Sequence, residues 1–224
     1  MSALLRYQTS IMLRSHRWIF PLIAYGLLVS VGAAASMPLA EGLNWSAAML
    51  VPVVAFVTRS MLLAEPDAAR ACVAAAVGPV RAQLATLLVA LGGGVVLGAG
   101  GAIFEVLTAA SVSAGDSNKI SATVAHPAVL LAGLGTAIVC LLIGSAVGAL
   151  CNPPLLRHPG LAMLSTLAAI VLALASNVSP ASAALREGGS LKAAHWPGGI
   201  PLAVAAAVLA ITWTASVLAA ANRG

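Results

Sequence analysis

The chain has 224 residues, of which 61% are hydrophobic and only 8% are charged. A soluble domain of this size carries roughly a quarter charged residues, so this surface cannot be kept in water and lipid must be the solvent. The formal net charge of +5 does not indicate nucleic-acid binding, because the basic residues stand singly near the ends of apolar segments, without an aromatic platform.

The first 17 residues are expected to form an amphipathic helix that lies in the membrane interface. Polar side chains recur at helical spacing on one side, at Arg6, Ser10, Arg14 and Arg17. Apolar side chains occupy the other side, at Leu4, Tyr7, Ile11 and Trp18. Such a helix turns its arginines toward anionic headgroups, so membrane lipid is an expected partner. The simpler alternative is a basic flank that only fixes the orientation of the chain.

Six apolar stretches are long enough to cross a bilayer as helices, which requires about 20 residues each. They cover residues 18–37, 45–63, 83–107, 127–150, 161–178 and 200–220. The chain is therefore predicted to be an all-α integral membrane protein, with a single transmembrane domain of about six helices over residues 1–224. The segments 108–126 and 179–199 are predicted to be short outer loops.

The basic residues predict the orientation of these spans. Eight of the eleven fall on one side: Arg6, Arg14, Arg17, Arg59, Arg70, Arg81, Arg157 and Arg223. The other three fall on the opposite side: Lys119, Arg186 and Lys192. Because Lys and Arg favour the cytoplasmic side, both termini are predicted to be cytoplasmic. We expect a multi-pass protein of a cell membrane, specifically a bacterial plasma membrane.

The connection between the second and third spans has the start and stop signals of a short helix. Pro66 suits the first helical turn, and Glu65 and Asp67 complement the positive end of the helix dipole. Gly78-Pro79 ends the helix before Arg81 returns to the interface. A bare connection needs only a few residues, so a discrete helix predicts a docking role. The alternative is a helix that lies on lipid.

The third and fourth spans are rich in glycine. Residues 92–101 include six glycines, with Gly94 and Gly98 in a GxxxG pair. Small residues of this kind allow close helix packing, and a hinge in a moving bundle would use the same residues. On the fourth span, Ser145 lies between Gly144 and Gly148. Packing explains that segment better than a catalytic serine, because every histidine lies at a span end or in a loop.

Polar groups inside the spans are few. Glu105 is the acidic candidate for a path or gate, although we favour the interpretation that it reaches the interface. Thr166 and Asn177 on the fifth span are candidates to line a path or to bond a neighbouring helix. The sequence contains no cluster of His, Cys, Asp or Glu, so no metal site is predicted. It also lacks a phosphate-binding loop, so this chain is not expected to hydrolyse ATP itself. Three cysteines are expected to be free thiols: Cys72, Cys140 and Cys151.

This layout resembles the permease subunit of a type-2 ABC exporter. The resemblance rests on six spans with both ends inside, the interfacial helix, and the acidic residues, short helix and small-Pro-x-Arg turn of residues 65–81. The segment 144–150 is also similar to the family's glycine-rich fourth helix. Residues 179–199 depart from the pattern, because glycine and proline interrupt them where members often have re-entrant helices.

The resemblance implies that the chain docks a separate cytoplasmic ATPase subunit, which would hold ATP and Mg, while this chain holds no cofactor and is not an enzyme. The docking residues that it implies are Glu65, Asp67, Arg70, Val73, Val77 and Arg81. It also implies a second permease chain, identical or homologous. We expect export of an amphipathic or lipid-like molecule. Two alternatives remain: the substrate-capture component of an ATP-driven importer, and a membrane anchor or assembly protein that transports nothing.

Overall fold

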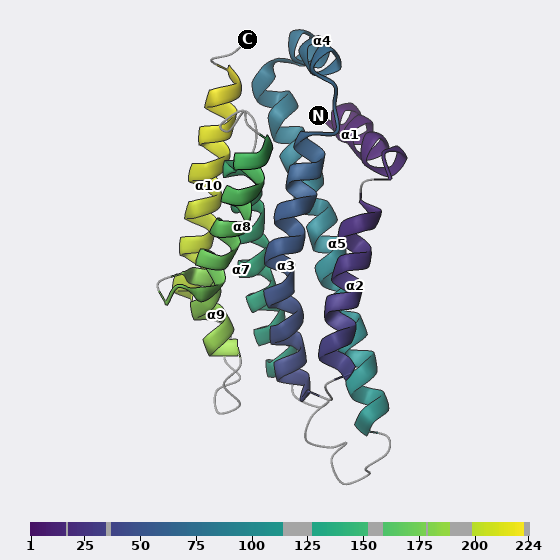
Figure 1. Ribbon diagram of the computed structural model, residues 1–224, viewed down its shortest axis with the longest axis vertical. Helices are drawn as coiled ribbons and strands as arrows, with labels where there is room; N and C mark the ends of the chain where they lie inside the picture. The colour runs from purple at the N-terminus through teal and green to yellow at the C-terminus, as the bar shows by residue number, and fades with distance from the viewer. Residues whose placement is uncertain are drawn as a thin grey trace.

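The computed structural model of the chain describes residues 1–16, 18–34, 37–113, 127–151, 159–177, 179–188 and 199–221. These residues contain helices and no strands (Figure 1). The helices are α1 (Ser2–Arg14), α2 (Ile19–Ala34), α3 (Leu39–Leu62), α4 (Asp67–Val77), α5 (Pro79–Ser113), α7 (Pro127–Leu150), α8 (Pro159–Ala175), α9 (Pro180–Gly188) and α10 (Gly199–Ala221).

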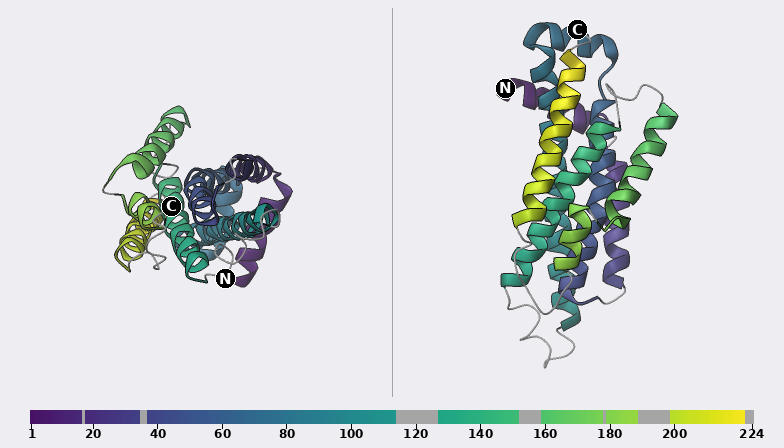
Figure 2. Two further views of the ribbon diagram at one scale, coloured as in Figure 1. Left: turned by 90° about the horizontal axis from the view of Figure 1, so that it is seen from below. Right: turned by 90° about the vertical axis from the view of Figure 1, so that its left-hand side faces the viewer.

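The long helices form an elongated bundle with α3 at its centre. Helices α1 and α4 and the last turns of α10 lie at the same end of the bundle, which we call the α4 end (Figure 1). Helix α8 stands at the edge of the bundle, away from α2 and α5 (Figure 2). Both ends of the described chain therefore lie at the α4 end.

Glycine on α7 brings this helix into backbone contact with α3. A Cβ atom on Gly144 would lie 2.7 Å from the carbonyl oxygen of Val51, and one on Gly148 would lie 2.8 Å from that of Ala55. Real Cβ atoms do not approach an oxygen so closely, so the pairing of these helices needs glycine at both positions. Ser145 is fully buried beside them. The geometry supports the packing interpretation of this segment.

Helix α5 uses its glycines in the same way. Gly94 and Gly98 face Val54 and Leu50 of α3, and a Cβ atom on either would lie 3.0–3.1 Å from those side chains. The helix is continuous from Pro79 to Ser113, without a break at the glycine run. The contacts therefore account for Gly94 and Gly98 as packing residues, and no break marks a hinge.

Among the described residues, four helices are individually long and apolar enough to cross a membrane: α3, α5, α7 and α10. The other two predicted spans are divided. Helix α2 has 16 residues and meets α1 at a bend of 71°, and α8 has 17 residues and meets α9 at a bend of 40°. The count reaches six when each bent pair is one span. Helix α3 also begins six residues before the predicted start, at Leu39.

Residues 180–188 correct one prediction. We expected 179–199 to be an outer loop, whereas Pro180 begins a helix, α9, that packs against α7 and α10. Ala181 and Ala184 are fully buried in this contact. The pattern of small residues was interpreted as a loop because it contains too few large apolar side chains to indicate a buried helix. Close packing on α7 needs only small ones.

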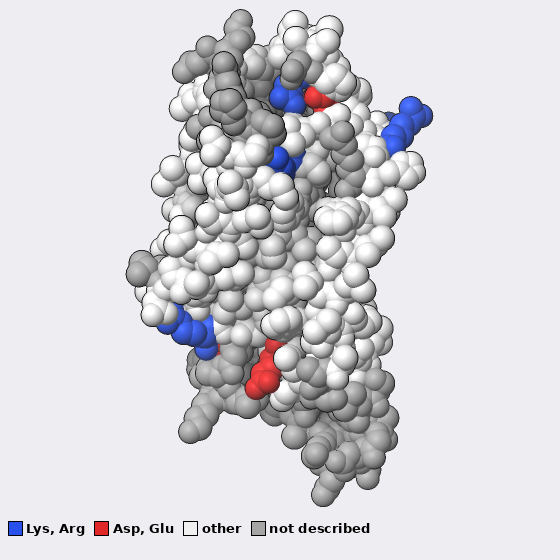
Figure 3. All heavy atoms as spheres, in the orientation of Figure 1, with Lys and Arg blue, Asp and Glu red and all other residues white. Residues whose placement is uncertain are grey.

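The outside of the bundle is apolar around its middle. Several large side chains are more than 60% exposed, from helices on different sides: Phe20 and Leu27 on α2, Val96 and Leu107 on α5, Leu172 on α8 and Ile211 on α10. The described charged residues lie toward the two ends in the view of Figure 3. Exposed apolar side chains on so many sides of the bundle are compatible with a multi-pass membrane protein.

Gly78 ends α4 with a backbone conformation that other residues avoid. Its φ is +88° and its ψ is 144°, and no atom would lie within 4 Å of an added Cβ. We expect Gly78→Ala to destabilise the α4–α5 corner by about 1–3 kcal/mol, from backbone strain alone. Thermal unfolding in detergent measures the effect. Gly92→Ala is the control, because Gly92 lies inside α5 and its Cβ would also be unobstructed. Equal melting temperatures for the two variants would contradict the prediction.

Candidate functional site

Helix α4 stands at the end of the bundle and packs on the beginning of α5. Arg70 joins it to α3, because the guanidinium donates to the carbonyl oxygens of Leu62 and Glu65. The Leu62 carbonyl belongs to the last residue of α3, where helix carbonyls lack intrahelical partners and favour a cation. Arg70 therefore caps α3 and fixes where α4 begins.

The opposite side of α4 is exposed and made of small apolar residues. We call it the α4 face: Ala68, Ala71, Cys72, Ala75 and Ala76, all exposed. These positions are spaced by three or four residues, so they form one stripe of the helix. No described element of the chain covers this stripe. A helix with one side on its own bundle and a second apolar side exposed is suited to fit into a groove of another molecule.

The predicted docking residues do not lie on one face. On α4, Arg70 and Val73 are half-buried and Val77 is exposed, whereas Arg81 is exposed in the first turn of α5. The side chain of Asp67 lies outside the described residues. The docking residues predicted from the sequence do not include the alanines or Cys72 of the α4 face. Their helical spacing was the signal that would have identified them.

Glu65 connects α4 to α1. It is half-buried and its carboxylate lies near the phenol of Tyr7, while its Oε1 atom has no hydrogen-bond partner. Partial burial of Tyr7 raises the pKa of its phenol, and the neighbouring Glu65 carboxylate raises it further. The loop that leads into α4 is thus held from two sides, by Arg70 and by α1.

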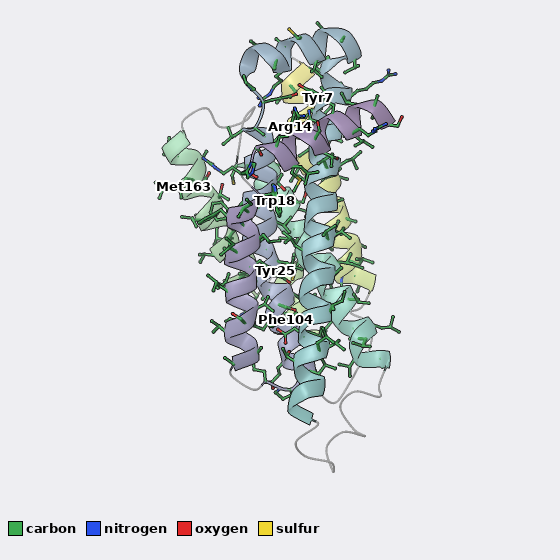
Figure 4. All side chains as sticks on the ribbon, turned by 90° about the vertical axis from the view of Figure 1, so that its right-hand side faces the viewer. Tyr7, Arg14, Trp18, Tyr25, Phe104 and Met163 are labelled. Carbon is green, nitrogen blue, oxygen red and sulfur yellow. The ribbon has the colours of Figure 1, made fainter. Side chains whose placement is uncertain are left out.

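Helix α1 lies across the end of the bundle (Figure 4). Arg6 and Arg14 are exposed, and Arg17 lies outside the described residues. The buried side differs from the prediction, because it is centred on Gln8, which is 3% exposed, whereas Tyr7 is 40% exposed. Met12 on this buried side meets Gly93 of α5. Helix α1 thus packs on protein through the side that carries Gln8 and Met12, which belongs to neither predicted stripe.

Glu105 corrects a second prediction, since it does not reach the surface. It is 4% exposed, and its Oε2 atom lies 2.5 Å from the position of a Cβ on Gly42, in the first turns of α3. Its Oε1 atom has no hydrogen-bond partner. Sequence reasoning missed Gly42, whose lack of a side chain makes room for the carboxyl group.

Tyr25 of α2 lies in the same part of the bundle as Glu105. Its phenol donates to the Ser46 carbonyl oxygen at 3.4 Å and fills the space left by Gly101, one turn before Glu105 on α5. Figure 4 shows Tyr25 and Phe104 at neighbouring levels between α2 and α5. Three helices thus bring a phenol and a carboxyl group together within an apolar bundle.

The other two candidate path residues make their hydrogen bonds within α8 or between α8 and α9. The Thr166 hydroxyl is buried and donates to Ala162 of its own helix at 2.6 Å. Asn177 is exposed, and both its side-chain and backbone oxygens accept from Arg186, at 3.1 Å and 2.8 Å. This pair joins the end of α8 to α9. Neither residue meets Glu105, so the predicted path residues do not form one site.

Asn44 of α3 anchors α9 to the centre of the bundle. Its Nδ2 atom donates at 2.7 Å to the carbonyl oxygen of Leu185, one of the last four carbonyls of α9. Such carbonyls have no partner inside their own helix and are costly to bury unbonded. Nothing in the sequence around Asn44 indicated this contact, because its partner is 141 residues away.

The described residues contain no group of three or more His, Cys, Asp or Glu side chains that could hold a metal ion. Cys72, Cys140 and Cys151 are free thiols, as predicted. No protein-family model, curated protein or solved structure matches the chain.

Proposed function

We propose that the chain is the permease subunit of an ATP-driven transporter of the type-2 ABC exporter kind, and that the α4 face is the surface on which a separate ATPase docks. One observation carries the proposal. Helix α4 is a discrete helix at the end of the bundle, bounded by Pro66 and Gly78, with an uncovered apolar stripe. A helix that served only to connect α3 to α5 would not need such a stripe.

The contacts of α4 suit the transmission of a movement. Arg70 ties its first turn to the last carbonyl of α3, and Gly78 joins its last turn directly to α5. Displacement of α4 by a partner would therefore move α3 and α5 together. The glycine contacts of both helices with their neighbours would pass the movement to the rest of the bundle.

The remaining parts of the proposal follow the layout of the spans. The α4 end faces the cytoplasm, because that orientation places Arg6, Arg14 and Arg81 on the cytoplasmic side, where basic residues are favoured.

The α8 helix, partly detached at the edge of the bundle, is suited to contact a second permease chain. Residues 180–188 reduce the departure from the family layout, since a short helix lies where members often have re-entrant ones. The apolar interior suits an amphipathic or lipid-like molecule.

Cys72 is a natural probe for the docking surface. It lies exposed on the α4 face, whereas Cys140 and Cys151 are buried. In native membranes, we expect a short thiol-to-amine crosslinker to join Cys72 to a soluble ATPase subunit, identified by mass spectrometry of the product. In the purified chain without this partner, we expect a maleimide to label Cys72 and leave Cys140 and Cys151 unlabelled, because burial excludes the reagent.

The control is Cys72→Ala, which keeps a small apolar residue on the face and removes the thiol. It should lose the crosslink and retain assembly with the ATPase. Rapid maleimide labelling of Cys72 in native membranes, with no ATPase recovered with the chain, would contradict the proposal and leave the α4 face to lipid or to another partner.

A further inference from the structure

Glu105 occupies an enclosed position where α2, α3 and α5 meet. Gly42 on α3 and Gly101 on α5 lack the side chains that would fill the space now taken by Glu105 and Tyr25. With 4% of its surface exposed, the Glu105 side chain has almost no access to solvent. An acidic residue held so deeply in an apolar bundle needs a source of positive charge or hydrogen bonds.

The described residues do not provide that charge. Glu105 forms no ion pair with a described basic side chain, and its Oε1 atom, which is buried, has no hydrogen-bond partner. The titratable groups of the described helices that surround it are Tyr25 on α2, whose phenol is directed to Ser46, and Cys140 on α7, beyond Tyr25. Glu41, next to Gly42 on α3, is exposed. None of these groups is a cation.

A metal ion is a poor match for the position. Hard cations take about six or more oxygen ligands. The oxygens of the described residues nearby are already used within the protein, between Tyr25 and the Ser46 carbonyl and between the Thr108 hydroxyl and the Glu105 carbonyl. The Oε2 atom is confined by the backbone of Gly42. The positive charge that needs no coordination shell and no additional volume is a proton.

We propose that Glu105 is a proton-binding site of the bundle, occupied in this conformation and released only when α2, α3 and α5 separate. The geometry that supports it is the enclosed carboxyl group with one unpartnered oxygen, against glycine on α3. The site does not depend on ATPase docking at the α4 end, so either proposal can fail without the other.

The test uses dicyclohexylcarbodiimide, a lipophilic reagent that attacks protonated carboxyl groups in apolar surroundings. The full chain in lipid nanodiscs is labelled at neutral pH, and the modified residue is located by peptide mass spectrometry. We expect a stable adduct at Glu105 and none at Glu41, with the rate falling about tenfold per pH unit once the carboxyl group loses its proton. Glu105→Gln should abolish the adduct while the protein stays folded, and Glu41→Gln should leave it unchanged.

Two outcomes would overturn the proposal. One is a Glu105 that is unlabelled in the folded protein at neutral pH and labelled in the folded protein at acid pH, because the reagent would then reach a carboxyl group that is ionised at neutral pH. The other is protection by sodium ions at constant pH and ionic strength, with choline as the control salt, because the site would then bind a metal cation. Unchanged labelling in sodium and choline supports a proton.

Discussion

Gly148→Ala is expected to destabilise the bundle by about 1–3 kcal/mol, and Gly144→Ala by a similar amount. At Gly148 the new Cβ would lie 2.7 Å from the Cβ of Thr58 and 2.8 Å from the carbonyl oxygen of Ala55. At Gly144 it would meet the backbone of Val51. A side chain can rotate away from an added methyl group, but a backbone cannot, so α3 and α7 must separate along their shared length.

The effect is measured by thermal or denaturant unfolding in detergent, and the double variant should lose more stability than either single one. Gly26→Ala and Gly100→Ala are matched controls in α2 and α5, because no atom would lie within 4 Å of their new Cβ atoms. Alanine is the better helix former by about 0.5–1 kcal/mol, so these variants should be neutral or more stable. Unchanged stability in Gly148→Ala would show that α3 and α7 are not packed backbone to backbone.

Replacing both Ala71 and Ala75 with tryptophan is expected to abolish ATP-driven transport without unfolding the chain. Both residues are exposed on the α4 face, so the indole rings meet no part of the chain's own bundle. They would prevent α4 from entering a groove that fits a stripe of alanine side chains. Overpacking at two positions is expected to weaken docking by more than about 2.8 kcal/mol. This corresponds to a loss of ATPase binding, and of the transport that depends on it, of at least about a hundredfold.

The measurements are ATPase activity stimulated by the chain and co-purification of the ATPase subunit, each beside the melting temperature of the chain. Ala71→Ser with Ala75→Ser is the matched control, because serine keeps the size of the stripe and should keep docking. Arg70 is unsuitable for this test, since it caps α3 and its loss would disturb α4 itself. Full stimulation by the tryptophan variant would remove the α4 face from the proposal.

The sequence predicted those helices whose ends are marked by residues close by in the chain. Residues 67–77 form a helix because Pro66 and Gly78 delimit it, and residues 127–150 form one because the segment is apolar and follows His126-Pro127. The free thiols followed from the spacing of the cysteines. Such features depend on neighbours within a few residues, which any window of the sequence contains.

Contacts between distant segments could not be predicted in this way. The burial of Glu105 depends on Gly42, 63 positions earlier, and the anchoring of α9 depends on Asn44. The burial of the Gln8 side chain depends on how α1 lies across α5. In each case the decisive residue is small or polar, and its position in the sequence does not distinguish a contact with protein from one with lipid.

The sequence by itself determined that the chain is a helical protein suited to lipid, with a punctuated helix between two spans, because composition and helix caps are properties of the chain alone. Only the tertiary structure decided which face of α4 is exposed, that residues 180–188 are helical, and that Glu105 is enclosed rather than exposed. The reason is physical: helices that pack through glycine and alanine leave no strong apolar pattern, so the shape of the neighbouring helix decides which side is buried.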